Sequence, residues 1–280
     1  MQSLLQRNIM PLTQILAIAV FLLLLVIFWF WLFPKIKKSK ATAFPEGWRA
    51  IILKKVGFYN DLQPAEKTRF EKGIQEFLSE VVITGVGTEL NDTDKLLVAS
   101  SAVIPLFGFP GWKYRKLNEV ILYEGAFNQD YETREGQERN ILGMVGGSGM
   151  TGTMILSKAS LHQGFEQHSS HNVGIHEFVH LLDRADGGTD GVPEILLAQP
   201  FLIPWVKLMH QEIKAILEDA SDINPYGSTN EAEFFSVVSE YFFQQPKLLE
   251  KRHPELFSLL EKIFRQDLTG DPPAHQDHQI

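Results

Sequence analysis

The sequence contains no cysteine in 280 residues. This absence excludes a disulfide framework, a cysteine-ligated zinc site, an iron–sulfur cluster and a thiol nucleophile. Basic side chains are also in deficit, because 26 Lys and Arg stand against 34 Asp and Glu, a net charge of −8. Broad contact with a nucleic-acid backbone requires a surplus of Lys and Arg, so we expect no nucleic-acid partner. Hydrophobic residues make up 44%, as in globular proteins, which excludes wholesale disorder.

Residues 15–33 form an uninterrupted apolar run, ILAIAVFLLLLVIFWFWLF. About 20 such residues cross a bilayer as a helix. Four lysines follow it, Lys35, Lys37, Lys38 and Lys40. Because positive charge stays on the cytoplasmic side, the run predicts a single-pass membrane protein whose remaining chain is cytoplasmic. The alternative is a signal peptide cleaved after Ala41-Thr42-Ala43, which would export a protein beginning near Phe44; the position of the lysines after the apolar core argues against it.

Charge divides the chain at residue 40. Residues 1–40 hold five Lys and Arg and no acid, so the remainder carries 21 basic against 34 acidic side chains, a net charge of −13. We therefore predict three segments: a transmembrane anchor with a basic flank over 1–40, one mixed domain over 41–268, and a polar, disordered tail over 269–280.

Hydrophobic periodicity predicts an α+β fold for the mixed domain, mostly helical with a small sheet. Helices are expected at 64–80, 93–106, 170–182, 202–217, 230–244 and 246–264, and strands at 81–84, 120–123, 141–145 and 153–156. The glycine-rich stretch GGSGMTG between the last two strands indicates a hairpin turn rather than a phosphate-binding loop, because it lacks the lysine that such a loop needs. The last strand is also a candidate edge for an extended peptide.

The motif with chemical content is H-E-x-x-H at His176, Glu177 and His180. On a helix the two histidines lie one turn apart on one face, so both imidazoles can reach one metal ion. Glu177 lies beside them, where it can act on a metal-bound water. The surrounding residues are apolar, as a helix buried behind an active site requires. The alternative is a helix with two histidines that have no joint role.

A catalytic zinc usually has three protein ligands. No histidine lies between His180 and His210, so a carboxylate on a later helix is expected. Glu233 and Glu240 are seven residues apart, share a helix face and lie among aromatic residues; the pattern favours Glu233 and leaves Glu240 open. Glu231 fits a surface charge best.

Asp183 follows His180 by three residues and has two open interpretations. It either accepts a hydrogen bond from a ligand imidazole or ends the helix. The neighbouring histidines, His162, His168 and His171, are expected to be polar loop or capping groups rather than ligands.

HEFVHLLD, the following Asp186-Gly187-Gly188 and Gly191-Val192-Pro193, AEFFSVVSEYFF and LLVASSAVIPLF resemble the MtfA (Mlc titration factor A) family of zinc-dependent peptidases, from about residue 48 to residue 264. The stretch 226–235 is similar to the zinc site of the anthrax lethal factor catalytic domain. The resemblance implies a zincin-type domain with His176, His180 and Glu233 as zinc ligands. It also implies Glu177 as the general base and Tyr226 as the residue that stabilises the transition state.

The match is incomplete, because Val237 stands where lethal factor has an acid, and the apolar N-terminal run is extra. By its own pattern Tyr226 is only a tyrosine in a turn. With the resemblance, the chain is predicted to be a membrane-anchored, cytoplasmic Zn²⁺ metallopeptidase acting on a peptide or protein substrate. The alternatives are a zinc-containing binding module that holds a cytoplasmic regulatory protein at the membrane, and an exported peptidase.

Overall fold

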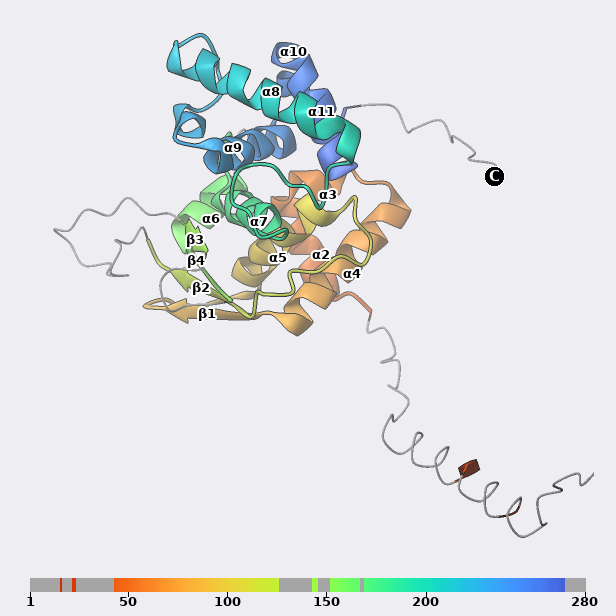
Figure 1. Ribbon diagram of the computed structural model, residues 1–280. Helices are drawn as coiled ribbons and strands as arrows, with labels where there is room; N and C mark the ends of the chain where they lie inside the picture. The colour runs from red at the N-terminus through yellow and green to blue at the C-terminus, as the bar shows by residue number, and fades with distance from the viewer. Residues whose placement is uncertain are drawn as a thin grey trace, which may run out of the picture. The chain divides into compact units, whose positions relative to one another are not determined.

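Helices make up most of the described chain in the computed structural model, which covers residues 43–125, 143–145, 152–166 and 169–269, with Leu16, Leu22 and Leu23 (Figure 1). The chain from Phe44 on groups as one unit. The described helices are α2 (Glu46–Lys55), α3 (Gly57–Asp61), α4 (Pro64–Glu80), α5 (Asp92–Leu106), α6 (Lys158–Gly164), α7 (Val173–Asp183), α8 (Gln199–Leu217), η1 (Pro225–Ser228), α9 (Glu231–Gln244), α10 (Pro246–Arg252) and α11 (Pro254–Phe264).

A small sheet accompanies the helices, which confirms the predicted mostly helical α+β fold. Within the described residues it has four strands in the order β1-β2-β4-β3. These are β1 (Val82–Val86), β2 (Glu119–Tyr123), β3 (Gly143–Val145) and β4 (Thr153–Ser157). The pairs β1–β2 and β2–β4 are parallel, whereas β3 pairs with β4 antiparallel. An antiparallel pair is what a hairpin connection produces, although residues 146–151 of the glycine-rich stretch lie outside the described residues.

Local chemistry sets several helix boundaries. The side chains of Asn172 and Asn230 accept from the backbone N–H groups three residues on, and so cap α7 and α9. The predicted single helix over 246–264 is wrong, because it consists of two helices that meet at His253. Pro254 follows, and a residue before proline is disfavoured in the helical region; His253 accordingly has φ −133° and ψ 62°.

Helix α7 lies in the middle of the described unit (Figure 1), with β3, β4 and α5 as neighbours and α9 against it as well. It approaches α5 closely at Gly174, where an added Cβ would lie 2.2 Å from the Ser101 Oγ. Large aromatic side chains around α7, α8 and α9 are fully buried, among them Phe178, Trp205, Phe234, Phe235 and Phe242. This core holds α7 and α9 in a fixed relation to each other.

The prediction of a single-pass membrane protein with a cytoplasmic domain is contradicted. No helix in the described part of the chain is both long and apolar enough to cross a membrane. The longest described helix, α8, has 19 residues but carries Lys207, Glu212 and Lys214, and charged side chains are costly in hydrocarbon. Of residues 15–33 only Leu16, Leu22 and Leu23 are among the described residues, and the predicted tail lies outside them after Thr269.

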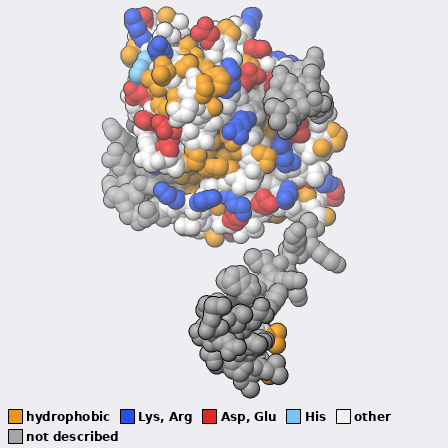
Figure 2. All heavy atoms as spheres, turned by 45° about the vertical axis from the view of Figure 1, so that its right-hand side comes forward, with side chains coloured by type: hydrophobic (Ala, Val, Ile, Leu, Met, Phe, Trp, Pro, Cys, Tyr) orange, Lys and Arg blue, Asp and Glu red, His pale blue; other side chains and the backbone are white. Residues whose placement is uncertain are grey.

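The surface of the described unit carries charges of both signs. Figure 2 shows Lys and Arg interspersed with Asp and Glu on one face, with hydrophobic side chains between them. A cavity of about 310 Å³ lies between α4, α5 and the segment that follows α5, and Phe77, Val103 and Trp112 are among its lining residues. The H-E-x-x-H residues do not line it, so the candidate site lies elsewhere.

Candidate metal centre

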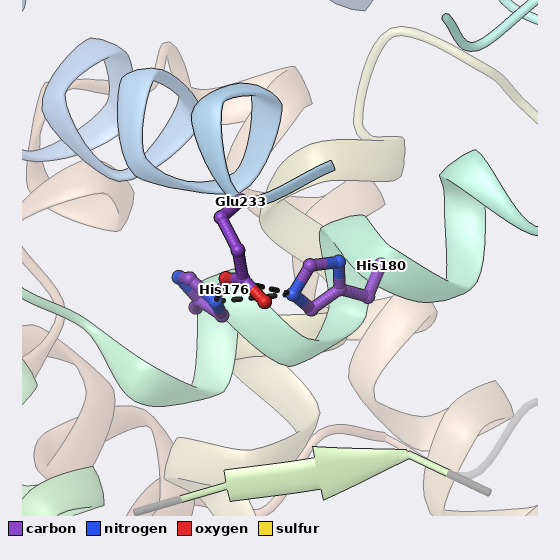
Figure 3. A group of neighbouring side chains, drawn as sticks. All are labelled: His176, His180 and Glu233. Carbon is purple, nitrogen blue, oxygen red and sulfur yellow. Dashed lines mark hydrogen bonds and ion pairs between the residues drawn. The ribbon is translucent and has the colours of Figure 1, made fainter. Parts of the chain in front are cut away.

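Three side chains from two helices converge on one point (Figure 3). His176 and His180 extend from α7, and Glu233 extends toward them from the first turn of α9. The Glu233 Oε2 lies 3.0 Å from the His176 Nε2 and 3.4 Å from the His180 Nε2. The two Nε2 atoms are 3.1 Å apart. In the described part of the chain, these three residues form the group with the spacing and donor types that hold a metal ion.

The triangle of donor atoms fits a tetrahedral zinc ion. With Zn–N and Zn–O bonds of about 2.0–2.1 Å, two ligand atoms of a tetrahedron lie about 3.3 Å apart. The three observed separations are 3.0, 3.1 and 3.4 Å. Two imidazoles and one carboxylate are also a ligand set that zinc accepts in catalytic sites, where a fourth position stays open. Donor type and spacing therefore both suit zinc.

Each histidine has a partner for its other ring nitrogen. The His176 Nδ1 lies 2.7 Å from the Glu240 Oε1, and the His180 Nδ1 lies 3.2 Å from the Ser236 Oγ. Both partners belong to α9, as does Glu233. Glu240, one of the two carboxylates that the sequence offered as a third ligand, therefore lies behind His176 rather than in the triangle. Ser236 was not foreseen, although its place three residues after Glu233 puts it on the same face.

The side chains of the cluster shift one another's pKa values in opposite directions. Burial opposes ionisation of Glu233, but hydrogen bonds with His176 and then His180 outweigh it and hold the Glu233 pKa well below its usual range. Burial likewise opposes the charge of His176, but Glu233 and Glu240 outweigh it and raise the His176 pKa to about 10. The carboxylates thus favour positive charge at this point, and a bound cation would supply that charge.

Two further predicted residues lie beside the cluster. Glu177 is 6% exposed, and burial raises its pKa above the usual value. The ring of Tyr226 lies 6.0 Å from that of His176, centroid to centroid. Tyr226 is half exposed, and partial burial together with the negative charge of Glu233 raises its pKa. The structure therefore brings both residues to the group formed by His176, His180 and Glu233.

Asp183 does not have the imidazole partner that one interpretation gave it, because Ser236 occupies the His180 Nδ1. Its Oδ2 instead accepts from the backbone N–H of Gly191 at 3.1 Å. The same glycine accepts from the Trp205 indole through its carbonyl oxygen at 2.7 Å. Gly191 has φ +71°, and a Cβ there would lie 2.2 Å from the Glu231 carbonyl oxygen. Asp183 thus helps to hold the loop against the start of α9, two residues before Glu233.

The other histidines near the motif do not join the cluster where the structure describes them, as predicted. The His162 Nε2 lies 2.6 Å from the buried Asp94, and the exposed His171 contacts Asn224, so neither joins the cluster. His168 lies outside the described residues. Glu231 is a surface charge, 3.5 Å from His210.

The suggestion that β4 presents a free edge to an extended peptide is wrong, because β2 and β3 pair with its two sides.

Comparison with known proteins gives related sequences along most of the chain. The sequence profile of the family described as Glucose-regulated metallo-peptidase M90 matches residues 32–265. The protein slr2042 of Synechocystis sp. is 29% identical over 231 residues, which cover 79% of this chain and 84% of that protein. Mlc titration factor A of Escherichia fergusonii is 29% identical over 238 residues, with 79% and 89% covered.

Mlc titration factor A of Pectobacterium atrosepticum is 35% identical over 161 residues, which cover 54% of this chain and 60% of the relative. These matches confirm the predicted resemblance to the MtfA family. The profile match includes both histidines of the motif and Glu233. The chain belongs to the Glucose-regulated metallo-peptidase M90 family, the family of peptidases that includes relatives named Mlc titration factor A.

Proposed function

We propose that this chain is a zinc-dependent peptidase of zincin type, with residues 41–268 as its catalytic domain. The observation that carries the proposal is the convergence of His176, His180 and Glu233 with Glu177 on the same helix turn. The His176 Nε2, His180 Nε2 and Glu233 Oε2 would hold the ion. Bound there, zinc supplies a Lewis acid that lowers the pKa of a bound water from 15.7 to about 7.

Glu177 is the proposed general base. Its carboxylate is buried, and burial moves its pKa up toward neutral pH. A group whose pKa lies near the working pH can both accept a proton and release it again. Glu177 would take a proton from the attacking water and pass it to the nitrogen of the leaving amine. Placement next to His176 in the sequence keeps it close to the ion without using it as a ligand.

Tyr226 is proposed to stabilise the transition state. As water attacks the peptide carbonyl, negative charge develops on the carbonyl oxygen, and a hydroxyl donor stabilises that charge more than it stabilises the neutral carbonyl. The Asn224 side chain accepts from the Tyr226 backbone N–H at 2.9 Å and so shapes the turn that carries the phenol. The role of Tyr226 rests on the likeness to lethal factor, which stays a prediction.

The test combines metal content with cleavage of a peptide library by the full chain. The wild-type protein should hold one zinc ion and cleave peptides. Glu177→Gln should retain the zinc and lose about 100-fold or more of kcat/KM, the usual contribution of a general base. Glu231→Gln, an exposed acid in α9, is the matched control and should act as wild type. Wild-type cleavage by Glu177→Gln would overturn the mechanism.

A second candidate is a binding module that holds a regulatory protein. It is favoured by the name of the relatives, Mlc titration factor A, which describes the titration of another protein. In that case Glu177→Gln would lose peptide cleavage and keep its effect on the partner. The biological effect on the partner, measured with wild type and with Glu177→Gln, separates the two candidates, because an effect that depends on binding survives loss of the general base and an effect that depends on cleavage does not.

A further inference from the structure

Glu240 lies in the middle of α9 with a side chain 7% exposed. It contacts the His176 side chain and the backbone at the start of α7. Its Oε1 lies 2.7 Å from the His176 Nδ1. Its Oε2 accepts from the backbone N–H of Asn172 at 2.6 Å, at the start of α7. The exposed His171 is a further neighbour, with its Nδ1 3.9 Å from the Oε2. One carboxylate thus contacts both the N-terminal end of α7 and an imidazole one turn further on.

We infer that Glu240 is a positioning residue that fixes His176 in the tautomer with its proton on Nδ1. A neutral imidazole carries one proton, and the unprotonated nitrogen is the metal ligand. An ionised carboxylate only accepts hydrogen bonds, so the nitrogen that faces Glu240 must be the one that carries the proton. The Nε2, which points at Glu233 and His180, then offers its lone pair to the ion. The inference rests on the proposed zinc site and deepens it.

The two contacts of Glu240 require two acceptors, and this requirement separates a carboxylate from an amide. The Asn172 backbone N–H is always a donor, and it occupies one oxygen. In a Gln side chain the other atom is then an NH₂ group, which donates and favours a proton on the His176 Nε2. If the amide turns around, its NH₂ group faces the Asn172 N–H, and two donors meet in a buried site. Either orientation opposes zinc binding.

Ser236 is the natural comparison, because it faces the Nδ1 of the other histidine at 3.2 Å. A hydroxyl both donates and accepts, so it does not dictate the tautomer of His180. Replacing Ser236 tests whether the loss of any contact behind a ligand histidine weakens zinc binding by the same amount. We therefore expect the effect at Glu240 to exceed the effect at Ser236.

The experiment measures the zinc dissociation constant of the full chain by competition with a chromogenic chelator. Glu240→Gln should weaken zinc binding about 10- to 100-fold, the range found when partners of metal-bound histidines are replaced. Ser236→Ala should change it less than Glu240→Gln, and the exposed Glu231→Gln should leave it unchanged. In the zinc-loaded wild type, the Nδ1 proton of His176 should give a low-field NMR resonance that exchanges slowly. Glu240→Gln should lose this resonance.

Thermal unfolding of the metal-free proteins shows whether each variant folds. If Glu240→Gln does not, Glu240→Asp provides the test, because it keeps two acceptors but is one methylene too short to reach both donors. It should bind zinc more weakly than wild type. Unchanged zinc affinity in a folded Glu240 variant, or a wild-type His176 proton resonance in Glu240→Gln, overturns the inference and leaves the proposed peptidase intact. A wild-type protein that binds no zinc overturns both.

Discussion

Replacing Gly174 by Ala is expected to destabilise the protein, although Ala is the better helix former. Gly174 is the second residue of α7, where this helix meets α5. An added Cβ would lie 2.2 Å from the Ser101 Oγ, 2.8 Å from the Ser101 Cβ and 3.0 Å from the Leu161 Cδ1. Rotation of the hydroxyl relieves only the first contact, so the two helices must separate.

The magnitude follows from two opposing contributions to the free energy of unfolding. Overpacking of a tight core costs about 1–3 kcal/mol, and the gain in helix propensity from Gly to Ala returns about 0.5–1 kcal/mol. We expect a net loss of about 1–2 kcal/mol, or a fall in Tm of about 2–8 °C for a domain of this size. Gly47→Ala in α2 is the matched control: no atom lies within 4 Å of its added Cβ, and the Tm should rise slightly.

The assay is thermal and urea unfolding of wild type, Gly174→Ala, Ser101→Gly and the double variant. Ser101→Gly removes two of the three atoms that the new methyl group meets, the Ser101 Oγ and Cβ, so the double variant should recover part of the loss, with a coupling of about 1 kcal/mol. A rise in Tm for Gly174→Ala as large as that for Gly47→Ala would refute the close approach of α7 and α5. Strict additivity of the two substitutions would refute the assigned contact.

Three other outcomes are expected. Tyr226→Phe should lower kcat about 100- to 1,000-fold with unchanged zinc content, as measured by steady-state kinetics and metal analysis. His253 has a raised pKa because Glu212 and then Asp222 stabilise its charged form, against the effect of burial. This stabilisation is complete below the unfolded pKa of about 6.5 and is lost as the pH rises through the folded value. The difference in unfolding free energy between wild type and His253→Gln should therefore shrink from pH 6 to pH 9. Burial raises the pKa of Asp183 to about 6, so its ionisation opposes folding as the pH rises; Asp183→Asn should raise the Tm relative to wild type at pH 8 more than at pH 5.

Prediction from the sequence succeeded where the information was local. Spacing by four placed His176 and His180 on one turn, and the structure has them there with Nε2 atoms 3.1 Å apart. The small sheet and most helices followed from periodicity. The break at His253 was missed, although Pro254 was a local signal for it. The membrane prediction came from the apolar run of residues 15–33 and the lysines that follow it, and it is contradicted because no helix in the described part of the chain is long and apolar enough to cross a membrane.

The sequence by itself determined which residue types can carry the chemistry: without cysteine, any metal must be held by His and carboxylate, and H-E-x-x-H supplies two of the proposed ligands. Only the tertiary structure decided which carboxylate joins them. Glu233 and Glu240 share one face of α9 because they are seven residues apart, so spacing could not separate their roles. Packing of α9 against α7 places Glu233 at the Nε2 atoms of the two histidines and Glu240 at the Nδ1 of His176. The same packing makes Ser236, rather than Asp183, the partner of the His180 Nδ1. Contacts between distant segments depend on how two helices dock, and no local sequence pattern encodes that.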